Sequence, residues 1–183
     1  MRSRIFTVPN QLSFLRLGFL PFFIILIHSG KYGWALGVLI LAALTDGLDG
    51  LLARKLDQRT TLGALLDPIA DKLLLSSSFI VLALNGKLHW WLTILVLSRD
   101  VLILTTAAVI LVVVGYRPFP PSIYGKITTF VQILLVFAVV TSAAFDRPWI
   151  DFVERSLIYV VTGFTIFSGF HYSVVIARRL NKG

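Results

Sequence analysis

The segment DGLDGLLARKLDQRTTLGALLDPIADK, residues 46–72, is rich in acids for so apolar a chain. Four aspartates, Asp46, Asp49, Asp67 and Asp71, lie within or beside stretches that have the length and composition of membrane-spanning helices. A carboxylate in hydrocarbon costs about 2.5–3.5 kcal/mol on insertion scales, so acids at such positions indicate a function. The segment therefore predicts a polar site held between two apolar helices.

The composition indicates a membrane protein. Of the 183 residues, 57% are hydrophobic and 14% are charged, and a water-soluble domain of this size could not bury so many apolar side chains. The net charge of +8 comes from basic residues at the ends of apolar runs, which favours an anionic membrane surface over nucleic acid as the partner. The absence of cysteine excludes disulfides, thiolate nucleophiles and cysteine-ligated zinc.

Six apolar stretches are each long enough to cross a bilayer core, which takes about 20 helical residues. They cover residues 11–28, 33–53, 62–86, 89–115, 123–145 and 152–177. Since the connections are short and free of repeats, we expect one domain over residues 1–183, an all-α bundle of six transmembrane helices. We expect a short amino-terminal segment, residues 1–9, to lie along the membrane interface.

Lysines and arginines predict the orientation of this bundle. With both termini inside, the inner segments carry ten of them, against Lys31, Lys87 and Arg147 on the outer loops. The inner ones are Arg2, Arg4, Arg54, Lys55, Arg59, Arg117, Lys126, Arg178, Arg179 and Lys182. Because cytoplasmic loops are enriched in Lys and Arg, we expect both termini and the acidic site to face the cytoplasm.

The spacing of the four aspartates brings them to one place. Asp46 and Asp49 are three residues apart, and Asp67 and Asp71 are four apart, so each pair shares a helix face. Counting ~1.5 Å per residue from the polar turn at residues 55–61 places Asp49 and Asp67 about 8 Å deep and the other two about 12–14 Å deep. Mg²⁺ or Mn²⁺ suits such an all-oxygen site, and two metals together serve phosphoryl transfer.

The same residues are also compatible with structural or transport roles. The acids could form an ion-pair network with Arg54, Lys55 and Lys72, or belong to a proton or cation pathway. Gly50 and Gly63 leave room for a phosphate or nucleotide to approach the backbone. Glycine also serves tight helix packing in membranes, which would account for them equally well.

The frame Asp46-x2-Asp49-Gly50-x2-Ala53-Arg54-x8-Gly63-x3-Asp67-x3-Asp71 resembles, position for position, the signature of the CDP-alcohol phosphotransferase family. The resemblance extends to the amino-terminal VPNQLSFLRLGFLP and to LSRDV in the fourth span, whereas the last two spans are generic. It implies a metal-dependent transferase whose four motif aspartates hold two Mg²⁺ or Mn²⁺ ions. The ions would grip the diphosphate of a CDP-linked donor, CDP-diacylglycerol.

The resemblance also implies roles for the other motif positions. Gly50, Ala53, Arg54 and Gly63 would line the pocket for the cytidine and phosphates. Asp71 would be the general base, taking the proton as the acceptor hydroxyl attacks the lipid-side phosphorus and CMP leaves. A homodimer is a further implication of the resemblance.

The acceptor is a separate question. The chain is similar to the cardiolipin synthases of this family, which use phosphatidylglycerol, and to its phosphatidylglycerophosphate synthases, which use glycerol 3-phosphate. The latter more often have Arg-Glu where this chain has Arg99-Asp100, which favours phosphatidylglycerol; inositol phosphate and serine are less favoured acceptors. Candidates for binding an anionic acceptor are Arg99, Lys126, Lys72 and Asn10.

Each candidate could also serve the structure alone. Arg99 lies in mid-span, where an unpaired guanidinium is costly, and the length of its span would place it at about the depth of Asp71. A pair with a neighbouring acid would account for it equally well, and we expect the adjacent Asp100 to point elsewhere, toward a partner of its own. Lys126 could be a positive-inside anchor, and Arg16 either an interfacial anchor or a substrate contact.

Two further classes of protein use intramembrane acids. Prenyltransferases also hold metal-bound diphosphates on aspartate-rich motifs, but they lack the Asp-Gly-x2-Ala-Arg frame. A cation carrier would transport ions without releasing CMP and would hold its acids nearer the middle of the membrane.

Overall fold

The computed structural model describes the backbone of residues 8–55, 61–114, 123–145 and 147–180, with side chains for 14–47, 70–105, 123–145, 147–170 and 172. Within these ranges the chain forms α1 (Val8–His28), α2 (Tyr32–Lys55), α3 (Thr61–Leu84), α4 (Trp90–Val114), α5 (Ile123–Phe145) and α6 (Pro148–Leu180). The all-α class and the expected order of six helices are confirmed. The proposed interfacial segment lies outside the described residues, apart from its last two, which begin α1.

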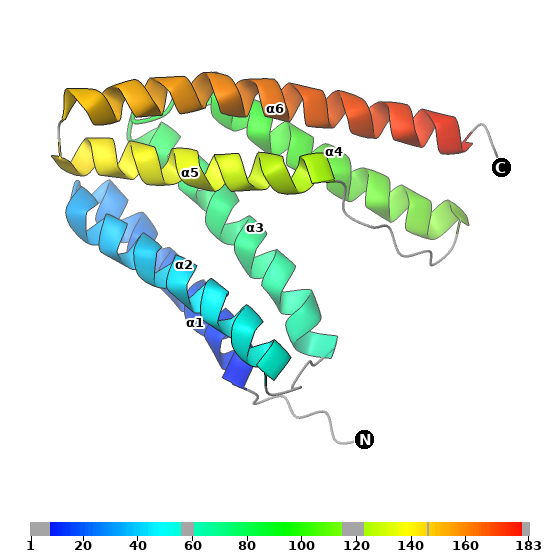
Figure 1. Ribbon diagram of the computed structural model, residues 1–183, viewed down its shortest axis with the longest axis horizontal. Coiled ribbons are helices and arrows are strands. Elements are labelled where there is room, and N and C mark those ends of the chain that lie inside the picture. Colours follow the sequence, from blue (N-terminus) through cyan, green and yellow to red (C-terminus); the bar gives the residue numbers. More distant parts are fainter. Residues whose placement is uncertain (1–7, 56–60, 115–122, 146, 181–183) are drawn as a thin grey trace.

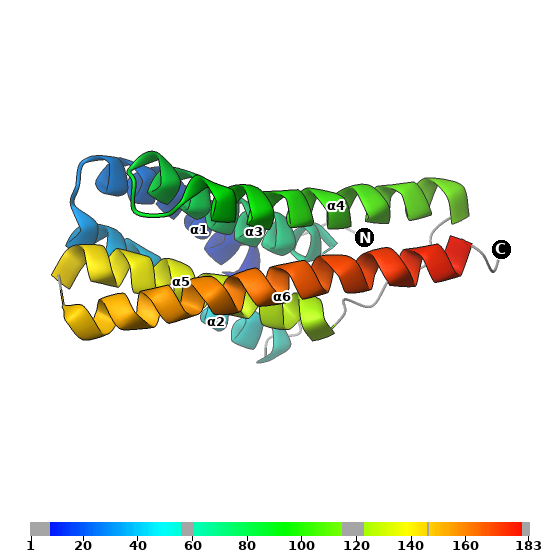
Figure 2. The same ribbon diagram turned by 90° about the horizontal axis from the view of Figure 1, so that it is seen from above.

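Two antiparallel hairpins frame the molecule. Helices α1 and α2 form one hairpin, and α5 and α6 form the other (Figure 1). Helix α3 packs mainly on α1, and α2 packs against α5, so that the two hairpins are joined. Helix α4 runs along α6, as the view from above shows (Figure 2).

Glycine turns close two of the helices. Gly30 and Gly86 follow α1 and α3 with φ angles of 69° and 67°, in the left-handed region that favours glycine. After Gly30, the Lys31 N–H donates to the carbonyl of Leu26 at 2.9 Å, and the turn after α3 repeats this bond. This is the Schellman arrangement, which satisfies the last carbonyls of a helix. Two of the short connections expected from the sequence are therefore tight, capped turns.

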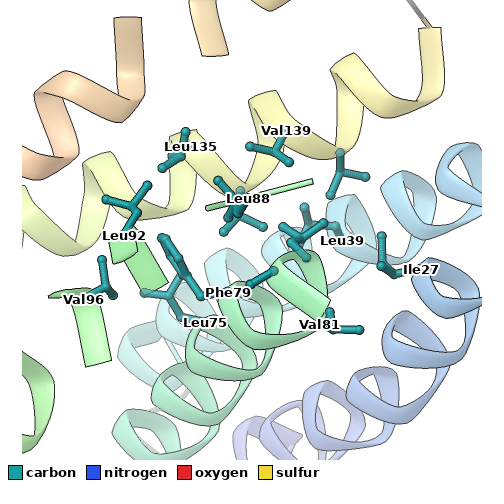
Figure 3. Close-up of a cluster of buried hydrophobic side chains, with 14 of the residues drawn as sticks. Ile27, Leu39, Leu75, Phe79, Val81, Leu88, Leu92, Val96, Leu135 and Val139 are labelled. Carbon is teal, nitrogen blue, oxygen red and sulfur yellow. The ribbon is translucent and has the colours of Figure 1, made fainter. Parts of the chain in front are cut away.

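The apolar core lies toward the end of the bundle where these turns are. Figure 3 shows its side chains gathered between α1, α2, α3, α4 and α5. The members with no exposed surface are Phe23, Ile27, Ala35, Phe79, Leu82, Leu92, Leu135, Val140 and Val161. The packing thus fixes one end of the helices, and the polar residues of α2 and α3 lie further along, away from it.

The outer surface is strongly apolar. Trp34, Phe152 and Tyr159 are 75%, 72% and 78% exposed, and large apolar side chains face outward on all six helices. Among the described residues, α5 alone is clearly long and apolar enough to cross a membrane, with a mean hydropathy of 2.1. Shorter apolar stretches cover Phe14–His28 and Tyr32–Gly47. So extensive an exposed apolar surface is typical of a protein that contacts a membrane.

Candidate active site

Two of the predicted metal-binding acids meet at one arginine. Arg16 of α1 donates from Nη2 to Asp46 Oδ1 of α2 at 2.7 Å, and from Nη1 to Asp71 Oδ1 of α3. Arg16 is buried, with 1% of its side chain exposed, whereas the two carboxylates are 54% and 50% exposed. The structure therefore brings together two acids that the sequence places at about the same depth on adjacent helices.

The other motif positions lie on the same two helices. The residues whose side chains fall outside the described part are Asp49, Gly50, Ala53 and Arg54 on α2, Gly63 and Asp67 on α3, and Asn10 on α1. Their predicted roles in binding the metals, the CDP donor and the acceptor stay predictions. Helices α2 and α3 carry all eight motif positions between them, on either side of the short connection that joins them.

A cavity of about 430 Å³ opens beside the paired acids. Its polar end is formed by Arg16, Asp46, Asp71 and Lys72. The remaining wall is mainly apolar and comes from α2, α3 and α5, with Leu39, Leu75, Phe130, Ile133 and Phe137 among its residues. A charged end and an apolar wall within one cavity suit an amphiphilic ligand whose polar part lies against the acids.

The sequence predicts that Arg16 is an interfacial anchor or a substrate contact. In the structure it instead joins two acids of the motif. The signal is present in the sequence, because an arginine inside an apolar helix must find a partner. Its helix α1 packs against both α2 and α3, so a carboxylate from either is within reach. The sequence alone does not show that one guanidinium joins two acids of the motif.

A second ionic cluster lies next to the first. Lys72 Nζ is 2.6 Å from Asp100 Oδ1, and Arg99 Nη1 donates to the same oxygen at 2.8 Å. Arg99 Nη2 donates to Ser168 Oγ of α6 at 2.9 Å. The cluster thus joins α3, α4 and α6, with Arg99 and Lys72 on one oxygen of Asp100. The depth expected for Arg99 in the membrane stays a prediction.

One expectation about this cluster is wrong. The sequence predicts that Asp100 points away from Arg99, but a single oxygen of Asp100 accepts from both Arg99 and Lys72. The carboxylate is 7% exposed, and a buried acid is stabilised by more than one donor. The local acid pair that the sequence leaves open for Arg99 is therefore formed. Lys126 is exposed in the first turn of α5 and is not among the residues that line the cavity.

The described carboxylates fit a hard divalent cation. Among the described side chains no group of three or more acids or histidines could hold a metal, and Asp49 and Asp67 lie outside that set. Asp46 and Asp71, however, direct oxygens from two helices to one cationic group, and about half of each side chain remains exposed beside the cavity. An all-oxygen donor set of this kind suits Mg²⁺ or Mn²⁺.

Comparison with known proteins shows the family of the chain. The profile of the CDP-alcohol phosphatidyltransferases matches residues 6–167, which include both ionic clusters except for the outermost partner, Ser168. The match covers well over half of the chain. The chain therefore belongs to the CDP-alcohol phosphatidyltransferase family.

Individual relatives agree with this assignment. A putative cardiolipin synthase of Mycobacterium bovis is 38% identical over 130 residues, which cover 70% of this chain and 62% of that protein. A probable phosphatidylglycerophosphate synthase of Mycobacterium tuberculosis is 38% identical over 141 residues, covering 74% and 66%. The human cardiolipin synthase (CMP-forming) is 35% identical over 190 residues, covering 91% and 61%. The aligned part thus makes up less than two thirds of each relative's length.

Proposed function

We propose that the protein transfers a phosphatidyl group from CDP-diacylglycerol to the hydroxyl of a glycerol-containing acceptor and releases CMP. Beyond family membership, one observation carries this proposal. Asp46 and Asp71 converge on Arg16 at the charged end of a cavity whose remaining wall is mainly apolar. Such a site suits a lipid-linked diphosphate, because the phosphates face the charged end and the lipid follows the apolar wall.

Different motif residues would bind different parts of the donor. Two divalent cations, Mg²⁺ or Mn²⁺, would be held by Asp46, Asp49, Asp67 and Asp71. When bound, such ions neutralise the diphosphate and stabilise the charge that develops on the leaving oxygen. The proposed lining of the cytidine and phosphate pocket consists of Gly50, Ala53, Arg54 and Gly63.

Asp71 is the proposed general base. The acceptor oxygen forms a bond to the lipid-side phosphorus, the bond from that phosphorus to the CMP oxygen breaks, and the hydroxyl proton passes to an oxygen of Asp71. Arg16 holds Oδ1 of Asp71, which fixes the direction of the carboxylate. Because an aspartate is a weak base, its activity here depends on being held close to the reacting hydroxyl.

Phosphatidylglycerol is the proposed acceptor, with cardiolipin as the product. The Arg99-Asp100 pair supports this choice, as do relatives named cardiolipin synthase. Glycerol 3-phosphate is the competing acceptor, because another relative is named phosphatidylglycerophosphate synthase. The proposed acceptor-side residues are Lys72, Lys126 and Asn10, with Arg99 supporting them.

The proposed setting is a homodimer in the bilayer with six spans per chain. The apolar outer surface supports contact with lipid, and the distribution of lysine and arginine supports a cytoplasmic location of both termini and the active site. The CDP-linked donor would then reach the acids from the cytoplasmic half of the membrane.

Turnover by the purified full chain tests the proposal. CDP-diacylglycerol and Mg²⁺ are supplied with either phosphatidylglycerol or glycerol 3-phosphate, and CMP and lipid products are measured by mass spectrometry. We expect equal amounts of CMP and cardiolipin with phosphatidylglycerol, and loss of both in Asp71→Asn. Phosphatidylglycerophosphate as the product would change the acceptor, and no CMP with either acceptor would refute the transferase.

A further inference from the structure

The second ionic cluster carries one more positive charge than negative. Arg99 and Lys72 supply two cations, and Asp100 supplies one anion. The side chains of Arg99 and Asp100 are 5% and 7% exposed, whereas that of Lys72 is 35% exposed. The most solvent-accessible charge of the three is therefore the ammonium of Lys72.

Arg99 by itself is sufficient to balance Asp100. A buried carboxylate requires a charged, hydrogen-bonded partner, and the guanidinium at 2.8 Å provides one from the neighbouring residue. The additional charge of Lys72 thus has no counterpart within the cluster. Of these three residues, Lys72 is also the one that lines the cavity.

A chain of contacts fixes where this ammonium lies. Ser168 Oγ accepts from Arg99, Arg99 donates to Asp100 Oδ1, and Lys72 Nζ reaches the same oxygen at 2.6 Å. A lysine side chain is otherwise flexible, with about 2 kcal/mol of rotamer entropy. Because residues of α4 and α6 hold its anchor, the ammonium is oriented before any ligand binds.

We propose that Lys72 binds a phosphate oxygen of a substrate in the cavity, and that Asp100, held by Arg99 and Ser168, positions Lys72 for this contact. The polar end then has two parts, with carboxylates for a cation at Asp46 and Asp71 and an ammonium for an anion beside them. Arg99 acts through Asp100 rather than by touching substrate. The inference rests on the proposed function for the identity of the phosphate, which belongs either to the CDP donor or to the glycerol-containing acceptor.

Binding measured without turnover tests this inference. Isothermal titration calorimetry on the full-length chain in detergent with Mg²⁺ uses CDP as the probe of the donor and glycerol 3-phosphate as the probe of the acceptor phosphate. Lys72→Met should weaken the binding of one probe by about 10- to 100-fold, since a charge-assisted hydrogen bond is lost. Asp100→Asn should weaken the binding of the same probe by about 3- to 10-fold, because the ammonium is retained but the carboxylate no longer holds it in place.

The double variant separates positioning from simple structural support. If Asp100 acts through Lys72, then Lys72→Met combined with Asp100→Asn should bind that probe no more weakly than Lys72→Met alone. Lys72→Arg should restore part of the affinity. The control is Lys31→Met, an exposed lysine in the α1–α2 turn, which should bind both probes as the wild type does.

The outcomes are distinct from those of the transferase assay. The probe that loses affinity identifies the donor or the acceptor as the source of the phosphate. Unchanged affinity for both probes, no binding of either probe by the wild type, or additive losses that follow the melting temperature would overturn the inference. Lys72-dependent binding in a protein that releases no CMP would refute the transferase and leave the anion site standing.

Discussion

The end of the bundle that carries the α1–α2 and α3–α4 turns is packed with buried apolar side chains, whereas the opposite part of α2, α3 and α4 carries two ionic clusters beside a cavity. At the first end, contacts are non-directional, and stability depends on filled volume. At the second, each charge depends on one or two named partners. Arg16 joins two acids there, and Asp100 joins two cations.

This difference indicates that stability and activity depend on different parts of the chain. Among the described residues, the packed cluster takes side chains from all six helices and none from the motif. The charged end is free to keep half-exposed carboxylates, which would be costly in the core. Substitutions at the two ends should therefore have separable effects on unfolding and on turnover.

The largest effect is expected from Asp71→Asn. It removes the proposed base and a metal ligand, and kcat for CMP release should fall by about 10²–10⁴-fold. The melting temperature should change little, because the side chain is half exposed and Arg16 keeps its contact with Asp46 at 2.7 Å. Mass spectrometry of CMP and thermal unfolding in detergent measure the two quantities.

A matched control exists at the other end. Asp151 accepts a hydrogen bond from Ser142 Oγ at 2.6 Å, close to the α5–α6 connection. Asp151→Asn should leave kcat near the wild-type value. Equal losses of activity in the two variants would mean that the charge of the whole chain, and not the acid at the cavity, matters.

Phe79→Ala should lower stability and leave activity unchanged, the reverse of Asp71→Asn. Phe79 has no exposed surface and lies within the packed cluster of Figure 3. Its truncation should reduce the free energy of unfolding by about 3–5 kcal/mol, because the remaining cavity is not refilled. The folded fraction should retain its kcat, measured well below the melting temperature. Phe79→Leu is the graded control, because it removes less volume and should cost less stability. A tenfold loss of kcat in the folded Phe79→Ala protein would show that the two ends are coupled.

Much of the fold follows from the sequence, because apolar length and turn residues decide it. The fifth span is predicted at residues 123–145, and α5 is Ile123–Phe145. The sixth helix, Pro148–Leu180, is longer at both ends than the predicted 152–177. The prediction follows apolar residues alone, whereas proline at the first helical position and Asp151 in the first turn favour an earlier start.

The site is predictable only where its residues share a helix or a motif. Asp46 and Asp71 follow from their distance to the connecting turn, and both contact Arg16. The partners of these residues come from elsewhere in the chain. Ser168 is a serine in an apolar helix with no spacing to distinguish it, and its contact with Arg99 depends on how α4 packs against α6.

Arg16→Lys tests whether the arginine that joins Asp46 and Asp71 is needed for activity at the charged end. Lysine keeps the charge but lacks the planar fork that reaches Asp46 and Asp71 together. The loss of one charge-assisted hydrogen bond should lower kcat by about tenfold. The Mg²⁺ concentration for half-maximal CMP release should also shift, because the two carboxylates are no longer held at a fixed separation. Wild-type kcat and Mg²⁺ dependence in this variant would contradict the role given to Arg16.

Thr93→Val is expected to have the smallest effect and is the strictest test of the packed end. Thr93 is fully buried, and its Oγ1 donates to the carbonyl of Phe79 at 3.3 Å, so that α4 and α3 share one polar contact inside the apolar cluster. Hydrogen bonds between membrane helices contribute about 0.6 kcal/mol on average, and valine fills nearly the same volume as threonine. The free energy of unfolding in detergent should therefore fall by about 0.6 kcal/mol, with kcat unchanged. Thr105→Val, an exposed position on the same helix, is the control for the substitution itself. A loss above about 2 kcal/mol at Thr93 would exceed what such a bond contributes in a membrane. The packed end would then depend on specific polar partners as the charged end does, and the contrast between the two would fail.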